Sequence, residues 1–209
     1  MIYIILVSLI FAYLVNKYTY IICNKIPKNR KIEMFIYISI ILVSILIYIK
    51  YNLTIELIKY ISLLPFLIII SIIDYHTTDI YDITLLGGII IQIIIILFSI
   101  INKHNDLLYY INGLFIGFII SFLIAKITKG LGEGDIGLFS LCCFSLGYNY
   151  ALYLIALSFI LAAIYSIYMI LIKNIKIKVI PFAPFISLST IMIMLTKFDL
   201  LNFYLNIIK

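Results

Sequence analysis

The sequence predicts an all-α protein, a polytopic transmembrane helical bundle of about eight spans in a single domain over residues 1–209. Its 209 residues are 66% hydrophobic and only 11% charged, whereas a soluble domain is about half apolar and about a quarter charged. The chain has too little polar surface to cover a soluble globule. Its apolar residues also form runs of about 17 to 24, long enough to cross a hydrocarbon core of about 30 Å as a helix.

Polar or glycine-rich breaks separate these apolar runs and define the expected spans. We expect helices at residues 2–22, 34–50, 57–73, 83–101, 107–127, 136–148, 150–172 and 182–196. The first break is the basic stretch from Asn24 to Glu33, and the third run closes at Asp74. The sixth run is short and bracketed by glycines, so we expect a half-length or tightly packed helix. The eighth starts at Pro181 and Pro184, which fix φ and remove two backbone donors, as at a stiff helix start.

The basic residues set the expected orientation, because short cytoplasmic loops carry an excess of Lys and Arg. With the N-terminus outside, the inner side holds Lys17, Lys25, Lys28, Arg30, Lys31, Lys126, Lys129, Lys173, Lys176 and Lys178, and the outer side holds Lys50, Lys59, Lys103, Lys197 and Lys209. The net charge of +6 then reflects topology and attraction to anionic membrane lipids. It does not indicate nucleic-acid binding, because the basic residues are spread over separate loops.

Most of the few acidic residues lie in two short loops that this orientation places on the inner side. These are Asp74, Asp79 and Asp82 after the third run, and Glu133 and Asp135 before the sixth. Ionisable groups at a membrane boundary tend to be solvated, paired or functional, and we interpret Asp79 and Glu133 as solvated. Asp74 ends a span and Asp135 directly precedes one. Two carboxylates held together keep one proton near neutral pH, which suits acid–base hydrolysis; the sequence leaves open whether the two meet.

Glycines surround the second of these aspartates. Asp135 follows the stretch Gly130-Leu131-Gly132-Glu133-Gly134. Glycine tolerates positive φ and allows another chain to approach closely. We therefore expect Gly132 and Gly134 to shape a loop that brings Asp135 next to a partner and next to an extended peptide substrate.

Several elements together resemble the type IV prepilin peptidase family, a group of intramembrane aspartyl peptidases. Gly132-Glu133-Gly134-Asp135 resembles its glycine-x-glycine-aspartate (GxGD) signature, Ile73-Asp74 with Asp82-Ile83-Thr84-Leu85 its first catalytic stretch, and Ile180-Pro181-Phe182-Ala183-Pro184-Phe185 the start of its last span. Fainter matches are Phe11-Ala12-Tyr13-Leu14-Val15-Asn16 and Ile26-Pro27. These elements follow the family order.

The resemblance implies an aspartic-type endopeptidase with Asp74 and Asp135 as its catalytic pair. By the same resemblance, Gly132 and Gly134 form the active-site loop, and Asp82, with Pro181 and Pro184, is accessory. The implied substrates are type IV prepilins or pseudopilins of a pilus or protein-secretion system. Cleavage falls between a basic leader and a hydrophobic helix, at the cytoplasmic face of the inner (plasma) membrane. The oligomeric state is left open.

The sequence departs from the family pattern in three places. Bifunctional members carry, after the first span, a long cytoplasmic insert with two cysteine pairs, and they also methylate the new N-terminus with S-adenosylmethionine. Only Asn24 to Glu33 lies there in this chain, so we expect a short-form peptidase without N-methyltransferase activity, zinc or another cofactor. Tyr81 replaces a proline, and Gly137 stands where many members carry lysine. A lost cation beside Asp135 removes a charge that would lower its pKa.

Other interpretations use the same residues differently. A presenilin-like or signal-peptide-peptidase-like protease would pair Asp82, in Tyr81-Asp82, with Asp135. Those proteases carry a C-terminal proline-alanine-leucine element, whereas this chain carries Pro-Phe-Ala-Pro. A non-enzymatic membrane transport or assembly subunit also uses boundary carboxylates and glycine-rich breaks, although hardly a charge lies at mid-membrane here. A family member that has lost activity and kept the fold is a third alternative.

Overall fold

The computed structural model describes residues 2–101, 106–171, 173 and 180–196, and these ranges contain eight α-helices. They are α1 (Ile2–Ile22), α2 (Arg30–Tyr51), α3 (Ile55–Thr77), α4 (Asp82–Ile101), α5 (Leu107–Thr128), α6 (Glu133–Leu146), α7 (Tyr148–Leu171) and α8 (Ala183–Thr196). Six of them, all except α6 and α8, are long and apolar enough to cross a membrane. The predicted all-α, multi-pass fold is confirmed. Each predicted segment overlaps its helix, although the sixth, 136–148, starts three residues after α6 does and also covers Tyr148, the first residue of α7.

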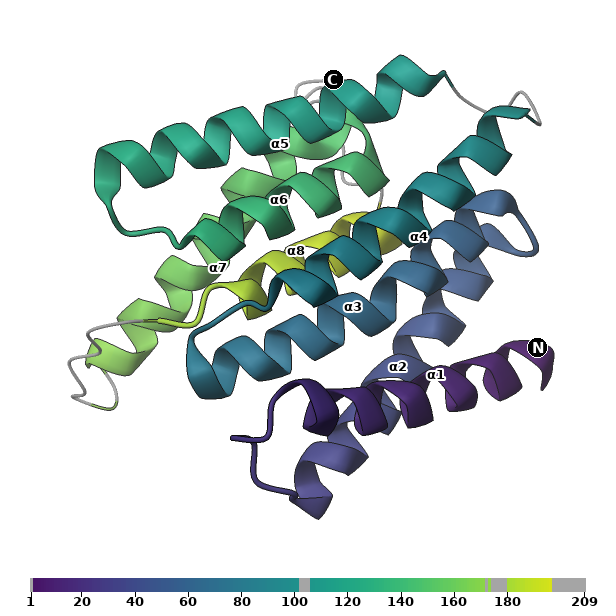
Figure 1. The fold of residues 1–209 in the computed structure, drawn as a ribbon, viewed down its shortest axis with the longest axis horizontal. Coiled ribbons are helices and arrows are strands. Elements are labelled where there is room, and N and C mark those ends of the chain that lie inside the picture. Colours follow the sequence, from purple (N-terminus) through teal and green to yellow (C-terminus); the bar gives the residue numbers. More distant parts are fainter. Residues whose placement is uncertain (1, 102–105, 172, 174–179, 197–209) are drawn as a thin grey trace, which may run out of the picture.

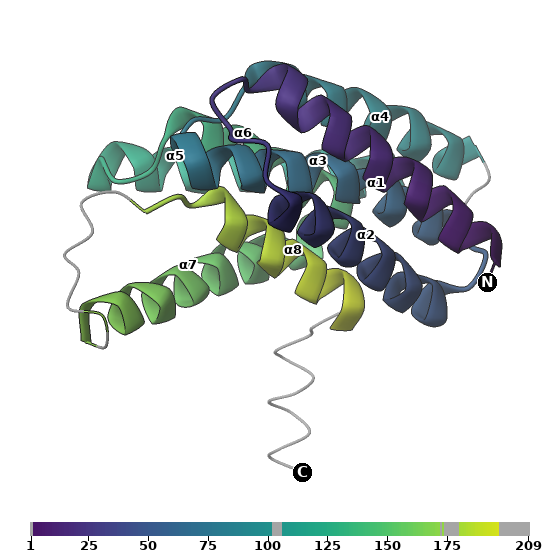
Figure 2. The ribbon, with the colours of Figure 1, turned by 90° about the horizontal axis from the view of Figure 1, so that it is seen from below.

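Successive helices run in opposite directions, so the breaks between them gather at two ends of the bundle (Figure 1). One end, called the aspartate end below, contains loops 23–29, 78–81 and 129–132 and the start of α8 at 180–182. The N-terminus of α1 lies at the opposite end. Seen from below, α8 lies between α2 and α7 (Figure 2), and it packs against both. Breaks that are far apart in the sequence therefore become neighbours.

Helix α6 is enclosed by its neighbours α4, α5, α7 and α8. It has 14 residues, and those from Leu138 to Leu146 are all buried. A helix of this length covers about 21 Å, less than the hydrocarbon core, and longer helices surround it. The predicted short, tightly packed sixth helix is confirmed.

Two glycines of α5 explain how closely α6 approaches. A Cβ on Gly113 would collide with the Cys143 carbonyl oxygen, and a Cβ on Gly117 would lie 2.8 Å from the Cys143 Sγ. Small residues four apart on an apolar helix allow this kind of close helix contact in membranes. The sequence carried the signal, but only the structure identifies α6 as the partner.

Lys59, which the orientation argument counts with the outer-side charges, is buried near the start of α3. It is only 4% exposed, and its Nζ lies 4.7 Å and 4.9 Å from the ring centroids of Tyr60 and Tyr110. Its carbonyl accepts a hydrogen bond of 3.1 Å from Gln92 Nε2 on α4. Lys59 therefore takes part in the packing of the bundle, where cation–π contacts stabilise it, and it carries less weight as a topology signal.

Candidate active site

Asp74 lies in the last turn of α3 with a buried side chain, 4% exposed. The helix ends when Thr78 takes a left-handed conformation and donates its N–H to the Asp74 carbonyl oxygen at 2.8 Å. The side chain reaches the neighbouring helix α8, where its Oδ2 accepts a hydrogen bond of 2.9 Å from the Ala183 N–H. A carboxylate at a helix N-terminus is stabilised by the unpaired N–H groups and by the helix dipole.

The start of α8 is built so that Ala183 faces α3. Ala183 is the first residue of α8, and Pro181 and Pro184 stand on either side of the Phe182-Ala183 pair. A proline in the first turn of a helix removes only a donor that has no partner inside the helix. Below it, the Ser71 Oγ donates to the Ser187 Oγ at 2.7 Å and joins α3 to α8. The predicted accessory prolines thus frame the segment that contacts Asp74.

Asp135 is the third residue of α6, and its side chain turns back over the helix start. Its Oδ2 accepts a hydrogen bond of 3.1 Å from the Gly132 N–H, as a capping acid at this position does. Its Oδ1 is buried and has no hydrogen-bond partner among the described residues. Burial, and after it the charge of Asp74, raise the pKa of Asp135 to about 7, while the Gly132 hydrogen bond opposes the rise. The two carboxyl groups are therefore near enough for one charge to act on the other.

The glycines of the 130–134 stretch allow close packing rather than unusual backbone angles. A Cβ on Gly134 would lie 2.6 Å from the Ile80 Cβ, so the start of α6 presses against loop 78–81. Gly132 has φ −74, and among the described glycines only Gly147 has a positive φ. The expected close approach is confirmed. The expected positive φ is wrong, because the left-handed residue that ends α5 is Lys129.

We expect Gly134→Ala to lower activity by about tenfold or more, because the new methyl group must push Ile80 away and tilt the start of α6, which carries Asp135. Displacements of about 1 Å can cost about a hundredfold in rate. Gly130→Ala is the matched control, since its nearest neighbour would lie at an ordinary 3.6 Å. Initial rates of the two purified variants, measured side by side, give the difference, and equal activity would contradict this account of Gly134.

The remaining predicted residues lie at the rim. Asp82 is the first residue of α4 and is exposed, as are Asp79 and Glu133. No hydrogen bond joins Asp82 to Asp74 or Asp135 within the described part of the chain. Asp82 has a structural role in the first turn of α4, because acidic residues there interact favourably with the helix dipole. Tyr81, in the place of the family's proline, contacts the Cys23 Sγ through its hydroxyl at 3.9 Å.

Gly137 stands close to α4. A Cβ there would meet the Leu85 Cδ1 at 2.8 Å, so a longer side chain at this position requires Leu85 to move. Over the ranges that the structure describes, no three His, Cys, Asp or Glu side chains are grouped as a metal site would need. The described cysteines, Cys23, Cys142 and Cys143, are free and buried.

Fold and site together define a multi-pass helical membrane protein with a pair of interacting carboxyl groups at one end of the bundle. A model of the Type IV leader peptidase family matches residues 61–167, which are 107 of the 209 residues. The chain belongs to the type IV leader peptidase family. No curated protein and no solved structure matches it.

The family match confirms the resemblance seen in the sequence, and it supports a role as an aspartic peptidase of the leader peptidase type. The matched range contains Asp74, Asp82, Asp135 and the glycines before Asp135. It ends before Pro181, so the α8 side of the site comes from the structure alone. Sequence reasoning missed the Ala183 N–H, because a backbone donor leaves no mark in the residue type.

Proposed function

We propose that this chain is an aspartic endopeptidase that removes the N-terminal leader of type IV prepilins or pseudopilins, with Asp74 and Asp135 as its catalytic pair. The observation that carries the proposal is that the carboxyls of Asp74 and Asp135 lie at the same end of the bundle (Figure 1), where burial, and after it the charge of Asp74, raises the pKa of Asp135. Two carboxyls that share one proton near neutral pH are the arrangement that acid–base hydrolysis needs.

The hydrogen bonds around the pair suggest a role for each member. Asp74 receives the Ala183 N–H, which stabilises its carboxylate, so Asp74 is the base that takes a proton from water. Asp135 has a pKa of about 7 and a buried Oδ1 without a partner among the described residues, so it carries the shared proton. It donates this proton to the oxygen of the scissile carbonyl.

The bond changes then balance without a further reactant. The water oxygen forms a bond to the carbonyl carbon while Asp74 takes its proton and Asp135 protonates the carbonyl oxygen. The tetrahedral diol collapses, the C–N bond breaks, and the leaving nitrogen receives the proton from Asp74. Asp135 recovers a proton as the carboxylic acid product forms, so the pair ends the cycle with the single proton with which it began.

The charges near the pair support a cytoplasmic active site. Loops 23–29 and 129–132, with their adjoining residues, lie at the aspartate end and contain Lys25, Lys28, Arg30, Lys126 and Lys129. Basic residues beside membrane spans favour the cytoplasmic side. Only residues 23–29 join α1 to α2, which supports a peptidase of the inner (plasma) membrane that does not methylate its product.

The alternatives find less support in the same site. A presenilin-like pair would need Asp82 beside Asp135, yet Asp82 is exposed and Asp74 is buried. A transport subunit would be an unusual member of a leader peptidase family. We therefore retain Asp74 as the partner of Asp135.

The proposal is tested by producing the chain together with a substrate that has a short basic leader, a glycine and an apolar helix. Loss of the leader is scored by gel mobility and by the mass of the new N-terminus. We expect cleavage after the glycine. An unprocessed substrate in the presence of folded, membrane-inserted chain would contradict the proposal.

We also expect the peptidase activity to fall as the pH rises above about 7. Because the pKa of Asp135 is raised to about 7, the protonated carboxyl is present below that pH and is lost as the pH rises through it. A reaction that needs this proton slows with the same apparent pKa, which belongs to the pair as a whole. The measurement is kcat/KM between pH 5 and pH 9 with one detergent and one substrate. Activity that rises steadily to pH 9 would contradict the assigned proton.

A further inference from the structure

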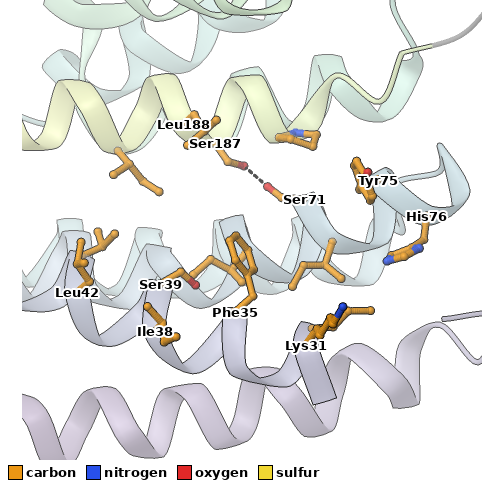
Figure 3. A pocket seen from close by; sticks show the side chains of 16 residues that line it. Lys31, Phe35, Ile38, Ser39, Leu42, Ser71, Tyr75, His76, Ser187 and Leu188 are labelled. Carbon is orange, nitrogen blue, oxygen red and sulfur yellow. Dashed lines mark hydrogen bonds between the residues drawn. The ribbon is translucent and has the colours of Figure 1, made fainter. Parts of the chain in front are cut away.

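A membrane-facing groove runs along α3 between two other helices. Helix α3 forms its floor, α2 and α8 form its walls, and its volume is about 640 Å³. Figure 3 shows Ser39 and Leu42 on the α2 side, and Ser187 with Leu188 on the α8 side. Since α2 and α8 each pack on α3, the space between them is a property of the fold.

The groove opens beside Asp74. Ser71, one turn before Asp74 on α3, lines it, and so does Tyr75, which follows Asp74. On the other wall the lining residue Pro184 follows Ala183, whose N–H binds the Asp74 carboxylate. The helices that hold Asp74 in place are therefore also the helices that build the groove. A segment lying in it ends beside the turn of α3 that carries Asp74.

The lining fits an apolar helix. Phe35, Ile38 and Leu42 of α2 and Leu188 of α8 present large apolar side chains, each 48% exposed or more. The polar groups deeper in the groove are already paired: the Ser71 Oγ donates to Ser187 at 2.7 Å and to the Leu67 carbonyl at 2.6 Å. Small residues at such positions let a second helix come close.

The charges at the aspartate end give the occupant a direction. Lys31 and His76 lie at that end of the groove (Figure 3). The exposed carboxylates Asp82 and Glu133 begin α4 and α6, which lie on the other side of α3 from α2 (Figure 1). A basic segment is repelled by Lys31 and attracted to Asp82 and Glu133. Lys126 and Lys129 adjoin Glu133, so Asp82 provides the stronger attraction.

We infer that the α2–α3–α8 groove seats the apolar helix of the leader-bearing substrate, while the basic leader crosses Asp74 and Asp135 toward Asp82 and Glu133. This inference rests on the proposed function and adds where the substrate binds and how it is directed. Charge complementarity selects the occupant, because an apolar helix preceded by a basic segment matches both the groove and the rim.

Cross-linking tests directly whether the apolar helix of the substrate lies in the groove. Leu188→Cys places a thiol in the groove. Leu86→Cys on α4 is the matched control, because both leucines lie in the second turn of a helix that begins at the aspartate end, they are 48% and 57% exposed, and only Leu188 lines the groove. The described native cysteines are buried and serve as background. The substrate carries one cysteine in the first turns of its apolar helix, and a short bismaleimide joins the two in membranes. We expect at least about tenfold more product at Leu188→Cys than at Leu86→Cys, and equal yields would overturn the inference.

The same samples separate this inference from the proposed function. Cleavage without preferred cross-linking at Leu188→Cys supports the proposed peptidase and overturns the inference about the groove. Preferred cross-linking at Leu188→Cys without cleavage supports the groove as the seat of the helix while contradicting the peptidase. A photoreactive phosphatidylglycerol tests whether lipid occupies the groove instead. If excess substrate prevents the lipid from labelling the groove, the inference is supported. If labelling persists in the presence of excess substrate, the groove binds lipid and the inference is overturned.

A kinetic readout excludes a merely structural effect. Leu188→Trp fills the groove, and we expect it to raise the KM for the whole substrate by about tenfold while leaving kcat within about twofold. A short peptide with the leader and cleavage site but no apolar helix should be cleaved as before, and Leu86→Trp should change the kinetics of neither substrate. An equal loss on both substrates by Leu188→Trp would overturn the inference.

Discussion

Asp74→Asn and Asp135→Asn should each reduce leader cleavage by roughly a hundredfold to ten-thousandfold, the usual contribution of a positioned acid or base. Asparagine keeps the shape of aspartate and cannot take up or give a proton in this role. The two losses should not multiply in the double variant, because one proton relay needs both carboxyls and fails when either is gone. The measurement is the initial rate of leader removal by purified variants at equal concentration.

Asp82→Asn is the matched control for both changes. It removes an acid from the same end of the bundle, but Asp82 is exposed at the first residue of α4 and Asp74 is buried. We expect it to keep measurable activity. All three variants should insert and melt like the parent, because asparagine keeps the shape of aspartate at the two paired positions and Asp82 is exposed. If Asp82→Asn abolishes cleavage while Asp74→Asn remains active, then Asp82, and not Asp74, is the catalytic partner of Asp135.

The order of the helices was readable from the sequence because membrane spans must be long, apolar and separated by polar breaks. The same rule placed Asp74 and Asp135 at span ends. Alternation of direction across the membrane then puts both at one end of the bundle, but which helices lie side by side there is not readable from the sequence.

Packing details could not be read in this way. Lys59 was counted with the outer-side charges, yet the rings of Tyr60 and Tyr110 surround it inside the bundle. The glycines before Asp135 were expected to allow a positive φ, and the structure uses Gly134 to let Ile80 approach instead. Both depend on which helix lies opposite, and local sequence does not specify that neighbour.

The backbone N–H at the start of α8 is another contact that the sequence does not reveal, and removing it is the second change for which we expect a large loss of activity. Ala183→Pro should lower kcat by roughly tenfold to a hundredfold, because it removes the N–H that Asp74 accepts at 2.9 Å. A hydrogen bond to a charged group contributes about 1.5–3 kcal/mol, and about 1.4 kcal/mol corresponds to a factor of ten in rate. Proline suits the first position of a helix, and the preceding Phe182 is not helical, as a residue before proline should be.

Ala183→Ser is the control that separates the lost donor from crowding. Ala183 is fully buried, so any larger side chain must be accommodated by its neighbours, but serine keeps the backbone N–H. If the donor matters, proline reduces kcat far more than serine does while both variants keep similar KM values and melting temperatures. Equal losses in the two variants would mean that packing against α3, rather than the N–H of Ala183, decides the rate. Helix α8 would then act only as a wall of the site.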